Sequence, residues 1–364
     1  MNRNDEFRPD WVSAPGDTIA DILEIRNLPT PEFARRMGQT LSETRGLLEG
    51  REPITSDLAQ KLHEVLGAST AFWINRECHY RQGLERIQEE SGETRADWLK
   101  ELPVKDMISF GWIAPASTSS EAVGKACLKF FDVSNVTAWR NEYRGALEVA
   151  NFRTSPSFKS HPGAVAAWLR QGEIEASSIV CKPWDSKKFK NALSKIRALT
   201  WTKKPSVFIP KLRSLCAECG VAVVIVRAPT GCRASGATHF LSPTKALLLL
   251  SFRYLSDDHF WFTFFHEAAH LLLHGKEALF LEGADMAPSM LEDEANDFAA
   301  NTLIPPEHKV SMLSLPRDGR EVLNFARSIG VAPGIVVGQL QHLGQLQRNQ
   351  LNALKRRFRW TSAE

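Results

Sequence analysis

The spacing of apolar residues predicts short helices in the first quarter of the chain. Between residues 10 and 85, runs with apolar side chains at helical intervals are separated by turn residues. Three of these runs begin with a capping residue and end at a glycine, spanning residues 30–38, 40–50 and 55–67. A turn of only three to four residues, which includes Gly38, separates the second predicted helix, at 30–38, from the third, at 40–50. We therefore expect a compact module of four or five helices with helix-turn-helix spacing.

The pattern changes twice further along. Residues 89–204 contain amphipathic helical runs, for example 119–131 and 163–176, with a loop near 154–163. After residue 205 come a strand at 221–226, a turn-rich hairpin at 229–241, a second strand at 245–252, and helices at 258–274 and 289–303. We expect a multidomain, mostly α plus α+β fold with these limits: an all-α helix-turn-helix domain at 10–88, a helical linking region at 89–204, an α+β domain with a small sheet at 205–345, and a basic C-terminal helix or tail at 346–364.

Composition places the chain among ordinary globular proteins. It has 364 residues, of which 43% are hydrophobic and 24% charged, and its net charge of +3 indicates no general affinity for polyanions. The N-terminal residues lack the apolar segment of a signal peptide, and no run approaches the ~18 apolar residues of a membrane helix. The six cysteines are scattered, without the spacing of a zinc ribbon. We expect a cytoplasmic protein with no membrane partner.

The segment HEAAHLLLHG at 266–275 carries the strongest chemical signal. A helix places His266 and His270 one turn apart on the same face, where both imidazoles can reach one metal ion, and Glu267 lies beside them. The alternative is a pair of buried histidines hydrogen-bonded to the backbone. His274 lies about 12 Å along the helix from His266, too far to share that ion, and suits the helix C-terminus instead.

A catalytic zinc site requires a third protein ligand and an open position. The following segment, PSMLEDEANDFAANTLIPP, offers several carboxylates. Ser289 and Glu292 have capping-box spacing, which gives Glu292 a structural role. On a helical wheel with Leu291, Ala295 and Phe298 inside, Glu294 lies at the edge of the inner face, so we expect it to reach the metal. A solvated helix face is the alternative for Glu294.

The two segments together resemble the ImmA/IrrE family of zinc metallopeptidases, over about residues 205–345. The resemblance implies Zn²⁺ as the cofactor, His266, His270 and Glu294 as its ligands, and Glu267 as the general base of an endopeptidase. Because an unrestrained peptidase in the cytoplasm would damage its host, we expect an activity that is narrow or depends on a partner. In such a site the base takes a proton from a zinc-polarised water and passes it to the leaving amine. The oxyanion donor stays open between Tyr254, His239 and His259, each of which has a structural role as its alternative.

Residues 11–85 resemble the HigA-type branch of the XRE helix-turn-helix family, on stretches such as TPEFARRMGQTLSETRGLLEGREPIT. The resemblance implies a recognition helix at 40–49, with Thr40, Ser42, Glu43 and Arg45 facing bases and Gln39, Thr44 and Arg51 near phosphates. Up to residue 90, however, 11 Lys and Arg face 16 Asp and Glu, which disfavours DNA. A dimer that concentrates Arg35, Arg36, Arg45 and Arg51 on one face overcomes that deficit. Protein docking or dimerisation is the alternative use of the module.

Two functions therefore compete. The first is a cytoplasmic DNA-binding regulator, a homodimer on a palindromic double-stranded operator, whose zinc domain cleaves a protein partner in a toxin–antitoxin, phage-related or stress-response circuit. The second is a non-catalytic, HigA-like antitoxin or repressor that uses the peptidase fold to dock a cognate toxin. The complete His266, Glu267 and His270 set favours the first, because a docking domain needs no base. The basic run at 354–360 is read as a solvated helix end, with a nucleic-acid contact as its alternative.

Overall fold

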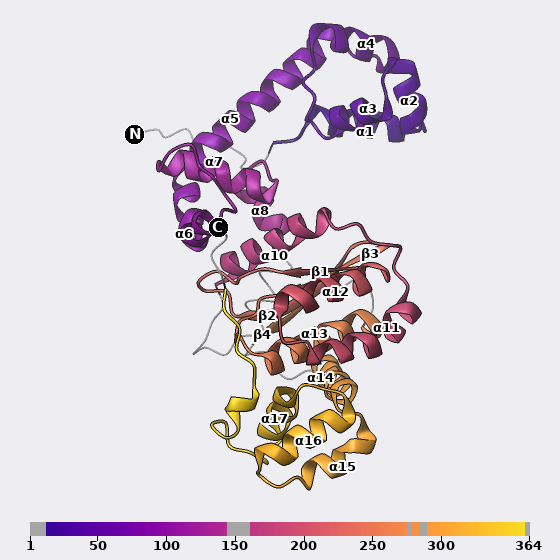
Figure 1. Cartoon of the computed structure of the whole chain (residues 1–364). Coiled ribbons are helices and arrows are strands. Elements are labelled where there is room, and N and C mark those ends of the chain that lie inside the picture. The colour runs from indigo at the N-terminus through magenta and orange to yellow at the C-terminus, as the bar shows by residue number, and fades with distance from the viewer. Residues whose placement is uncertain (1–11, 144–160, 275–278, 284–289, 361–364) are drawn as a thin grey trace. The chain divides into compact units, whose positions relative to one another are not determined.

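The computed structural model describes residues 12–143, 161–274, 279–283 and 290–360, which are mainly helical and include one small sheet (Figure 1). The chain divides into two compact units, Met1–Ala96 and Asp97–Glu364, and the division falls within the long helix α5 (Thr70–Glu101). Among the described helices, none has the length and apolar character needed to cross a membrane. The multidomain α plus α+β fold class is confirmed, whereas the domain limits given above stay predictions.

The first unit is a small helical bundle. Its helices are α1 (Pro15–Ile25), α2 (Thr30–Met37), α3 (Leu41–Leu48), α4 (Ser56–Leu66) and the beginning of α5. Phe33, Leu62 and Trp73 are among its fully buried core residues. The α2 helix ends at Gly38 in the left-handed conformation, with φ of 65°, as the sequence predicts. The short turn that follows leads into α3 and completes a helix-turn-helix.

In the second unit, the helices α6 (Val104–Ser109), α7 (Ser120–Phe131) and α8 (Val136–Glu142) surround an aromatic core together with the end of α5. Helix α10 (Pro162–Ser177) then connects this core to the sheet. Its Ala166 and Ala167 belong to the aromatic core, while Trp168 packs against the strands and donates a hydrogen bond to the carbonyl of Val226 at 3.0 Å. The end of the segment expected to link the domains is therefore part of the sheet's own packing.

The sheet has four strands in the order β1-β3-β2-β4: β1 (Val221–Ile225), β2 (Ala234–Ser242), β3 (Lys245–Leu250) and β4 (Phe280–Gly283). The β1 and β3 strands are parallel, and the other neighbours are antiparallel. The predicted hairpin at 229–241 proves to be a loop followed by β2, which pairs with β3. The sequence did not predict β4.

Helices cover both faces of the sheet because its strands are apolar on both sides. Val223 and Leu248 face α11 (Ser186–Ala198), α12 (Pro205–Ala217) and α13 (Asp257–Leu273), while Val224 and Leu249 face α10. A short η1 (Leu199–Trp201) joins α11 to α12. Figure 1 shows α10 and α13 on opposite sides of the sheet.

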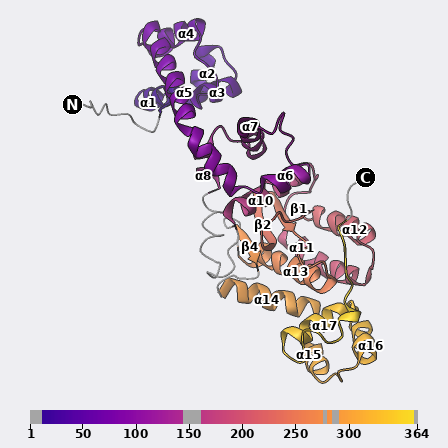
Figure 2. The ribbon, with the colours of Figure 1, turned by 90° about the vertical axis from the view of Figure 1, so that its left-hand side faces the viewer.

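The C-terminal third extends the same core. Helix α14 (Met290–Leu303) lies along α13 in the views of Figures 1 and 2. It is followed by α15 (Pro306–Leu313), α16 (Gly319–Ile329), α17 (Pro333–His342) and η2 (Asn352–Leu354). The chain then returns to the beginning of α13, where Lys355 Nζ lies 2.6 Å from Asp258 Oδ2 in a buried ion pair.

Candidate metal centre

Helix α13 holds the two histidines of the HEAAH segment in the protein interior. Its Phe264, Phe265 and Ala268 belong to the hydrophobic core, which fixes the rotation of the helix. His266 and His270 then share the neighbouring face, each with only 1% of its surface exposed. Their Nε2 atoms lie 3.0 Å apart, as the one-turn spacing predicts.

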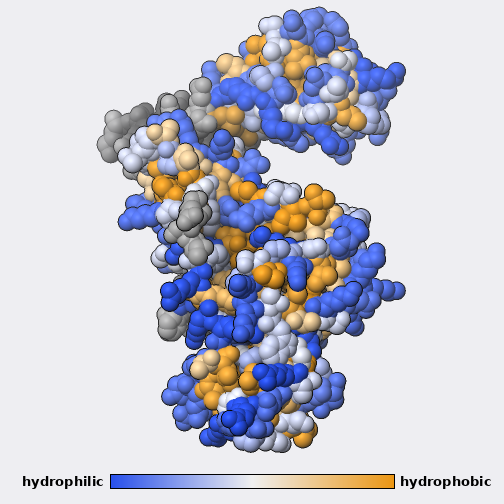
Figure 3. All heavy atoms as spheres, viewed as in Figure 1, coloured by the Kyte–Doolittle hydropathy of each residue, from blue (hydrophilic) through white to orange (hydrophobic). Residues whose placement is uncertain are grey.

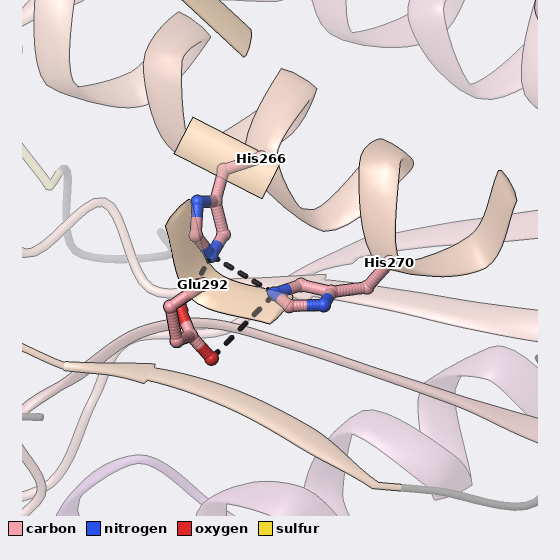
Figure 4. Close-up of side chains that lie close together, drawn as sticks. All are labelled: His266, His270 and Glu292. Carbon is pink, nitrogen blue, oxygen red and sulfur yellow. Dashed lines mark hydrogen bonds and ion pairs between the residues drawn. The ribbon is translucent and has the colours of Figure 1, made fainter. Parts of the chain in front are cut away.

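The third member of this cluster is Glu292 of α14, which corrects the prediction of Glu294. Glu292 Oε2 lies 3.2 Å from Nε2 of His266, and Oε1 lies 3.8 Å from Nε2 of His270. Figure 4 shows the three side chains converging from the two helices. Among the described residues, these three form the one group of His, Cys, Asp and Glu side chains whose ligand atoms lie together, within 4.8 Å of one another.

The helical wheel failed because it placed the large apolar Leu291 inside. Leu291 is instead 43% exposed, and the buried stripe of α14 contains Glu292, Ala295 and Ala299. The two alanines allow α14 to lie close to α13, and that contact turns Glu292 inward. The predicted capping box cannot be compared, because Ser289 lies outside the described residues.

Two further contacts orient the histidine rings. Nδ1 of His266 lies 3.0 Å from Oδ1 of Asn296, and Nδ1 of His270 lies 2.8 Å from Nδ1 of His274. Nε2 of His274 in turn lies 3.1 Å from Oε2 of Glu294. Because Nδ1 is engaged in both His266 and His270, each directs Nε2 toward Glu292. Such outer contacts commonly fix the orientation of metal-binding histidines.

His274 thus lies at the C-cap of α13, as expected, and outside the three-residue cluster. Glu294 is 58% exposed at its side chain and supports the site only through His274. The sequence did not predict the contact of His274 with His270 or that of Glu294 with His274.

Glu267 is fully buried next to the cluster, on the side that faces β2. The residue opposite is Gly236, and a Cβ built there would lie 2.5 Å from Oε1 of Glu267 and 2.7 Å from Cγ2 of Thr263. Only a glycine leaves space for the carboxylate in this position. An isolated glycine within a strand pattern often marks such a close approach, and that signal was available in the sequence.

The three oxyanion candidates lie in different places. His239 is on the opposite face of the sheet, where its Nε2 lies 3.5 Å from Oε1 of Glu173 in α10, so its prediction is wrong. His259 lies two turns, about 10 Å, before His266 on α13. The ring of Tyr254 stacks on His259 at 4.3 Å, and both line a hollow that extends to Thr263. Burial lowers the pKa of His259.

The predicted DNA-contacting residues surround α3. Ser42 and Arg45 are exposed, whereas Thr44 is completely buried and cannot sit near a phosphate, which corrects that prediction. Thr40 and Glu43 form a capping box: the Glu43 carboxylate accepts hydrogen bonds from the Thr40 amide at 2.7 Å and hydroxyl at 2.8 Å. These hydrogen bonds lower the pKa of Glu43. Gln39 is half-buried.

Several arginines expected to serve DNA are paired within the unit. Both Arg35 and Arg36 contact Glu32, at 2.7 Å and 3.0 Å, and their hydrogen bonds lower the pKa of Glu32 to about 2. Arg51 pairs with Glu49. Among the four arginines, Arg45 is thus the one for which no ion pair is found within the described part of the chain.

The geometry of the cluster fits a zinc ion. Two imidazole nitrogens and one carboxylate oxygen are the donors of many catalytic zinc sites, and ligands about 2.0–2.2 Å from a tetrahedral ion lie roughly 3.3 Å from one another. The 3.0 Å between the two Nε2 atoms and the 3.2 Å from Nε2 of His266 to Oε2 of Glu292 are close to that value, and one ligand atom from each of the three residues lies within 4.8 Å of the others. Three protein ligands leave a fourth position open.

Comparison with known proteins finds similarity for both the domain that contains the cluster and a helix-turn-helix regulator. Residues 220–337, which include the sheet, α13, α14 and the first half of α17, match the family described as IrrE N-terminal-like domain, a peptidase family. A 61-residue stretch is 39% identical to an uncharacterized HTH-type transcriptional regulator, YddM, of Escherichia coli. That match covers 17% of this chain and 65% of the regulator. Together the two matches support a fusion of a helix-turn-helix module with an IrrE N-terminal-like domain, a family that suggests a metallopeptidase-like fold.

Proposed function

We propose that the chain is a DNA-binding regulator with a zinc-dependent endopeptidase domain that cleaves a specific protein partner. The observation that carries the peptidase part is the burial of Glu267 beside His266, His270 and Glu292. A domain used only for docking gains nothing from a buried carboxylate in that position, which costs free energy. The circuit we propose is a toxin–antitoxin, phage-related or stress-response one, in the cytoplasm.

His266, His270 and Glu292 would hold the zinc ion. When bound, zinc supplies Lewis-acid chemistry, which polarises a peptide carbonyl and lowers the pKa of water toward ~7. Asn296 and His274 keep the imidazole rings oriented through their Nδ1 atoms. The apolar surroundings of α13 exclude bulk water and strengthen the electrostatic interactions within the site.

Glu267 would be the general base. On the side of β2, Gly236 leaves just the space that its carboxylate occupies, so that the carboxylate lies beside the three proposed ligands. There Glu267 accepts a proton from the attacking water and later donates it to the nitrogen of the leaving amine. Tyr254 and His259 remain candidates for stabilising the oxyanion.

The DNA part of the proposal rests on α3, where Ser42 and Arg45 present exposed side chains at the surface of the helix-turn-helix. Helices of this motif read bases from their early residues, and dimers bind two half-sites one helical turn apart. We therefore propose a homodimer on a palindromic operator, with sequence choice supplied by Arg45.

A trapping experiment tests the peptidase. Full-length protein with Glu267→Gln retains the shape of the side chain but not its basicity, so it should bind zinc and hold an uncleaved partner. The wild-type protein, treated identically, should instead yield the partner's fragments. General substrates such as casein should stay intact with either protein, because the activity is narrow or depends on a partner.

The same variant decides between the two functions. If Glu267→Gln retains the full effect of the wild type in the cell, the peptidase proposal fails. The domain is then a docking surface for a cognate toxin, as in a HigA-like antitoxin.

A further inference from the structure

Charge is distributed unequally between the two units. Residues 1–96 carry 12 Lys and Arg against 17 Asp and Glu, a net charge of −5, and since the whole chain has +3, residues 97–364 carry +8. Much of the excess lies in residues 186–217. This stretch contains no acidic residue and nine basic ones: Lys187, Lys188, Lys190, Lys195, Arg197, Lys203, Lys204, Lys211 and Arg213.

Helix α11 presents its lysines on one side. Phe189, Leu193 and Ile196 are buried in the core, and Lys187, Lys190 and Lys195 project from the opposite, exposed side. On α11, Lys188 is paired with Asp185 at 3.2 Å. The ion pairs found between described residues include none for the other three lysines.

Helix α12 continues this surface, because it contacts α11 and begins directly after two exposed lysines. Lys203 and Lys204 precede its first turn, and Lys211 is exposed on its second. Figure 3 shows hydrophilic residues over this side of the molecule, at the right-hand edge where α11 lies.

The C-terminal tail brings a distant basic segment to η1 and α12. The ring of Phe358 packs on Phe208 of α12 at 6.0 Å, and Arg356 donates a hydrogen bond to the carbonyl of Thr200 at 2.7 Å. Arg359, next to Phe358, is exposed. The resulting surface, here called the basic face, comprises Lys187, Lys190, Lys195, Lys203, Lys204, Lys211 and Arg359.

A surface that serves only solubility mixes charges of both signs. Basic residues that stabilise the fold have acidic partners. In the C-terminal tail, Lys355 and Arg356 are partly or fully buried and lie next to Asp258 and Asp257. The basic face lacks acidic neighbours along its sequence and presents several exposed positive charges. Such a surface suits a polymer with one negative charge per ~1.7 Å, as in duplex DNA.

We propose that the basic face binds the phosphate backbone of duplex DNA without sequence preference. The inference rests on the proposed DNA binding of the helix-turn-helix, which would choose the sequence. The unit that carries it, however, has a net negative charge and pairs four of its arginines internally. The basic face supplies the phosphate neutralisation that the first unit lacks. Because the helix-turn-helix needs this phosphate neutralisation on its own DNA site, we take duplex DNA, rather than RNA or an acidic protein, as the partner of the basic face.

The test measures how salt weakens binding of the zinc-loaded, full-length protein to a mixed-sequence duplex of about 30 base pairs, by fluorescence anisotropy. Each phosphate contact contributes ~0.9 to the slope of log affinity against log salt, so Lys187→Gln, Lys190→Gln and Lys195→Gln together should reduce the slope by about 3. The matched control removes three exposed lysines elsewhere in the second unit, by Lys105→Gln, Lys125→Gln and Lys129→Gln, and should leave the slope unchanged.

Replacing the same three lysines of α11 by arginine should preserve the slope, because arginine retains the charge. Equal slopes for the α11 and control variants would overturn the proposal, and so would a loss of RNA binding without a loss of DNA binding. Failure of the proposed helix-turn-helix function is recognised separately: Arg45→Ala then leaves binding to the upstream DNA of the gene unchanged, while the α11 variant still lowers the slope on every sequence.

Discussion

Glu292 and His266 come from different helices, and Oε2 of the first lies 3.2 Å from Nε2 of the second. Glu294 follows two residues later on α14 and is turned by about 200° around the helix axis. Its carboxylate therefore contacts His274, at 3.1 Å, rather than the cluster. One helix thus carries a proposed metal ligand and a residue that supports another ligand from outside.

Metal content separates these two carboxylates. Glu292→Ala should purify with little or no zinc, because it removes one of the three proposed zinc ligands. Glu294→Ala should retain a zinc ion, bound 10- to 100-fold more weakly, a typical order of magnitude for losing an outer contact. Metal analysis and competition with a chelator measure both. Normal zinc in the first variant together with its loss in the second would restore the original assignment of Glu294.

The sequence predicted the part of the site that lies within one helix. His266, Glu267 and His270 are related by the geometry of a single turn, which any sequence with this spacing imposes. The choice between Glu292 and Glu294 depends on how α14 is rotated against α13, and two alanines rather than Leu291 decide that rotation. Likewise, β4 depends on pairing with β2, and four residues give too short a pattern to recognise.

In the helix-turn-helix, too, the sequence predicted the local features but not those that depend on tertiary packing. Its helix limits and the glycine at its turn follow from local sequence, and Thr40 caps α3, so the sequence predicted them well; at α2, however, Pro29 rather than Thr30 is the N-cap, and no side chain caps that helix. The burial of Thr44 depends on tertiary packing, which no local pattern indicates.

Gly236 provides a test of Glu267 that leaves the ligands untouched. Gly236→Ala places a methyl group where Oε1 of Glu267 would lie 2.5 Å away, so the carboxylate has to move. Cleavage of the trapped partner should fall by about 100-fold or more, since displacing a general base removes most of its contribution. Zinc content should stay close to one per chain.

Gly319→Ala is the matched control, because the nearest atoms lie 3.8 Å from a Cβ at that position and ordinary packing accepts it. Unchanged cleavage in Gly236→Ala would show that the carboxylate has space to adjust, or that it does not act in the reaction.

Arg45 is the arginine of the helix-turn-helix best placed to read bases. Arg45→Ala should reduce the preference for the operator by about 1–3 kcal/mol, the usual range for losing a base contact. Binding to unrelated DNA should change little. Arg36→Ala serves as the comparison, because Arg36 already contacts Glu32 at 3.0 Å. Gel shifts with both duplexes measure the ratio, and an equal effect of the two substitutions would remove Arg45 from the recognition surface.

Asp257, at the beginning of α13, predicts a pH dependence of stability. It is fully buried, and burial raises its pKa to about 6, although a hydrogen bond from the Arg356 amide opposes the shift and the charge of Asp258 adds to it. At Asp258, burial also opposes ionisation, but hydrogen bonds from Lys355 and Ser256 outweigh it and lower that pKa. The two carboxyl groups therefore titrate in different pH ranges.

Between about pH 4 and pH 6, folded Asp257 holds a proton that the unfolded chain releases, so stability falls as pH rises through this window. A shift of about two units corresponds to at most ~3 kcal/mol. Asp257→Asn keeps the oxygen that accepts from Arg356 at 2.9 Å and cannot ionise, so it should not lose that stability. Urea unfolding of both proteins at several pH values from about 4 to 7 measures the difference, in which titration of the histidines cancels. Parallel curves for the two proteins would mean that Asp257 is ionised in the fold at pH 4, with the Arg356 side chain, 4.0 Å from its Oδ2, compensating its burial.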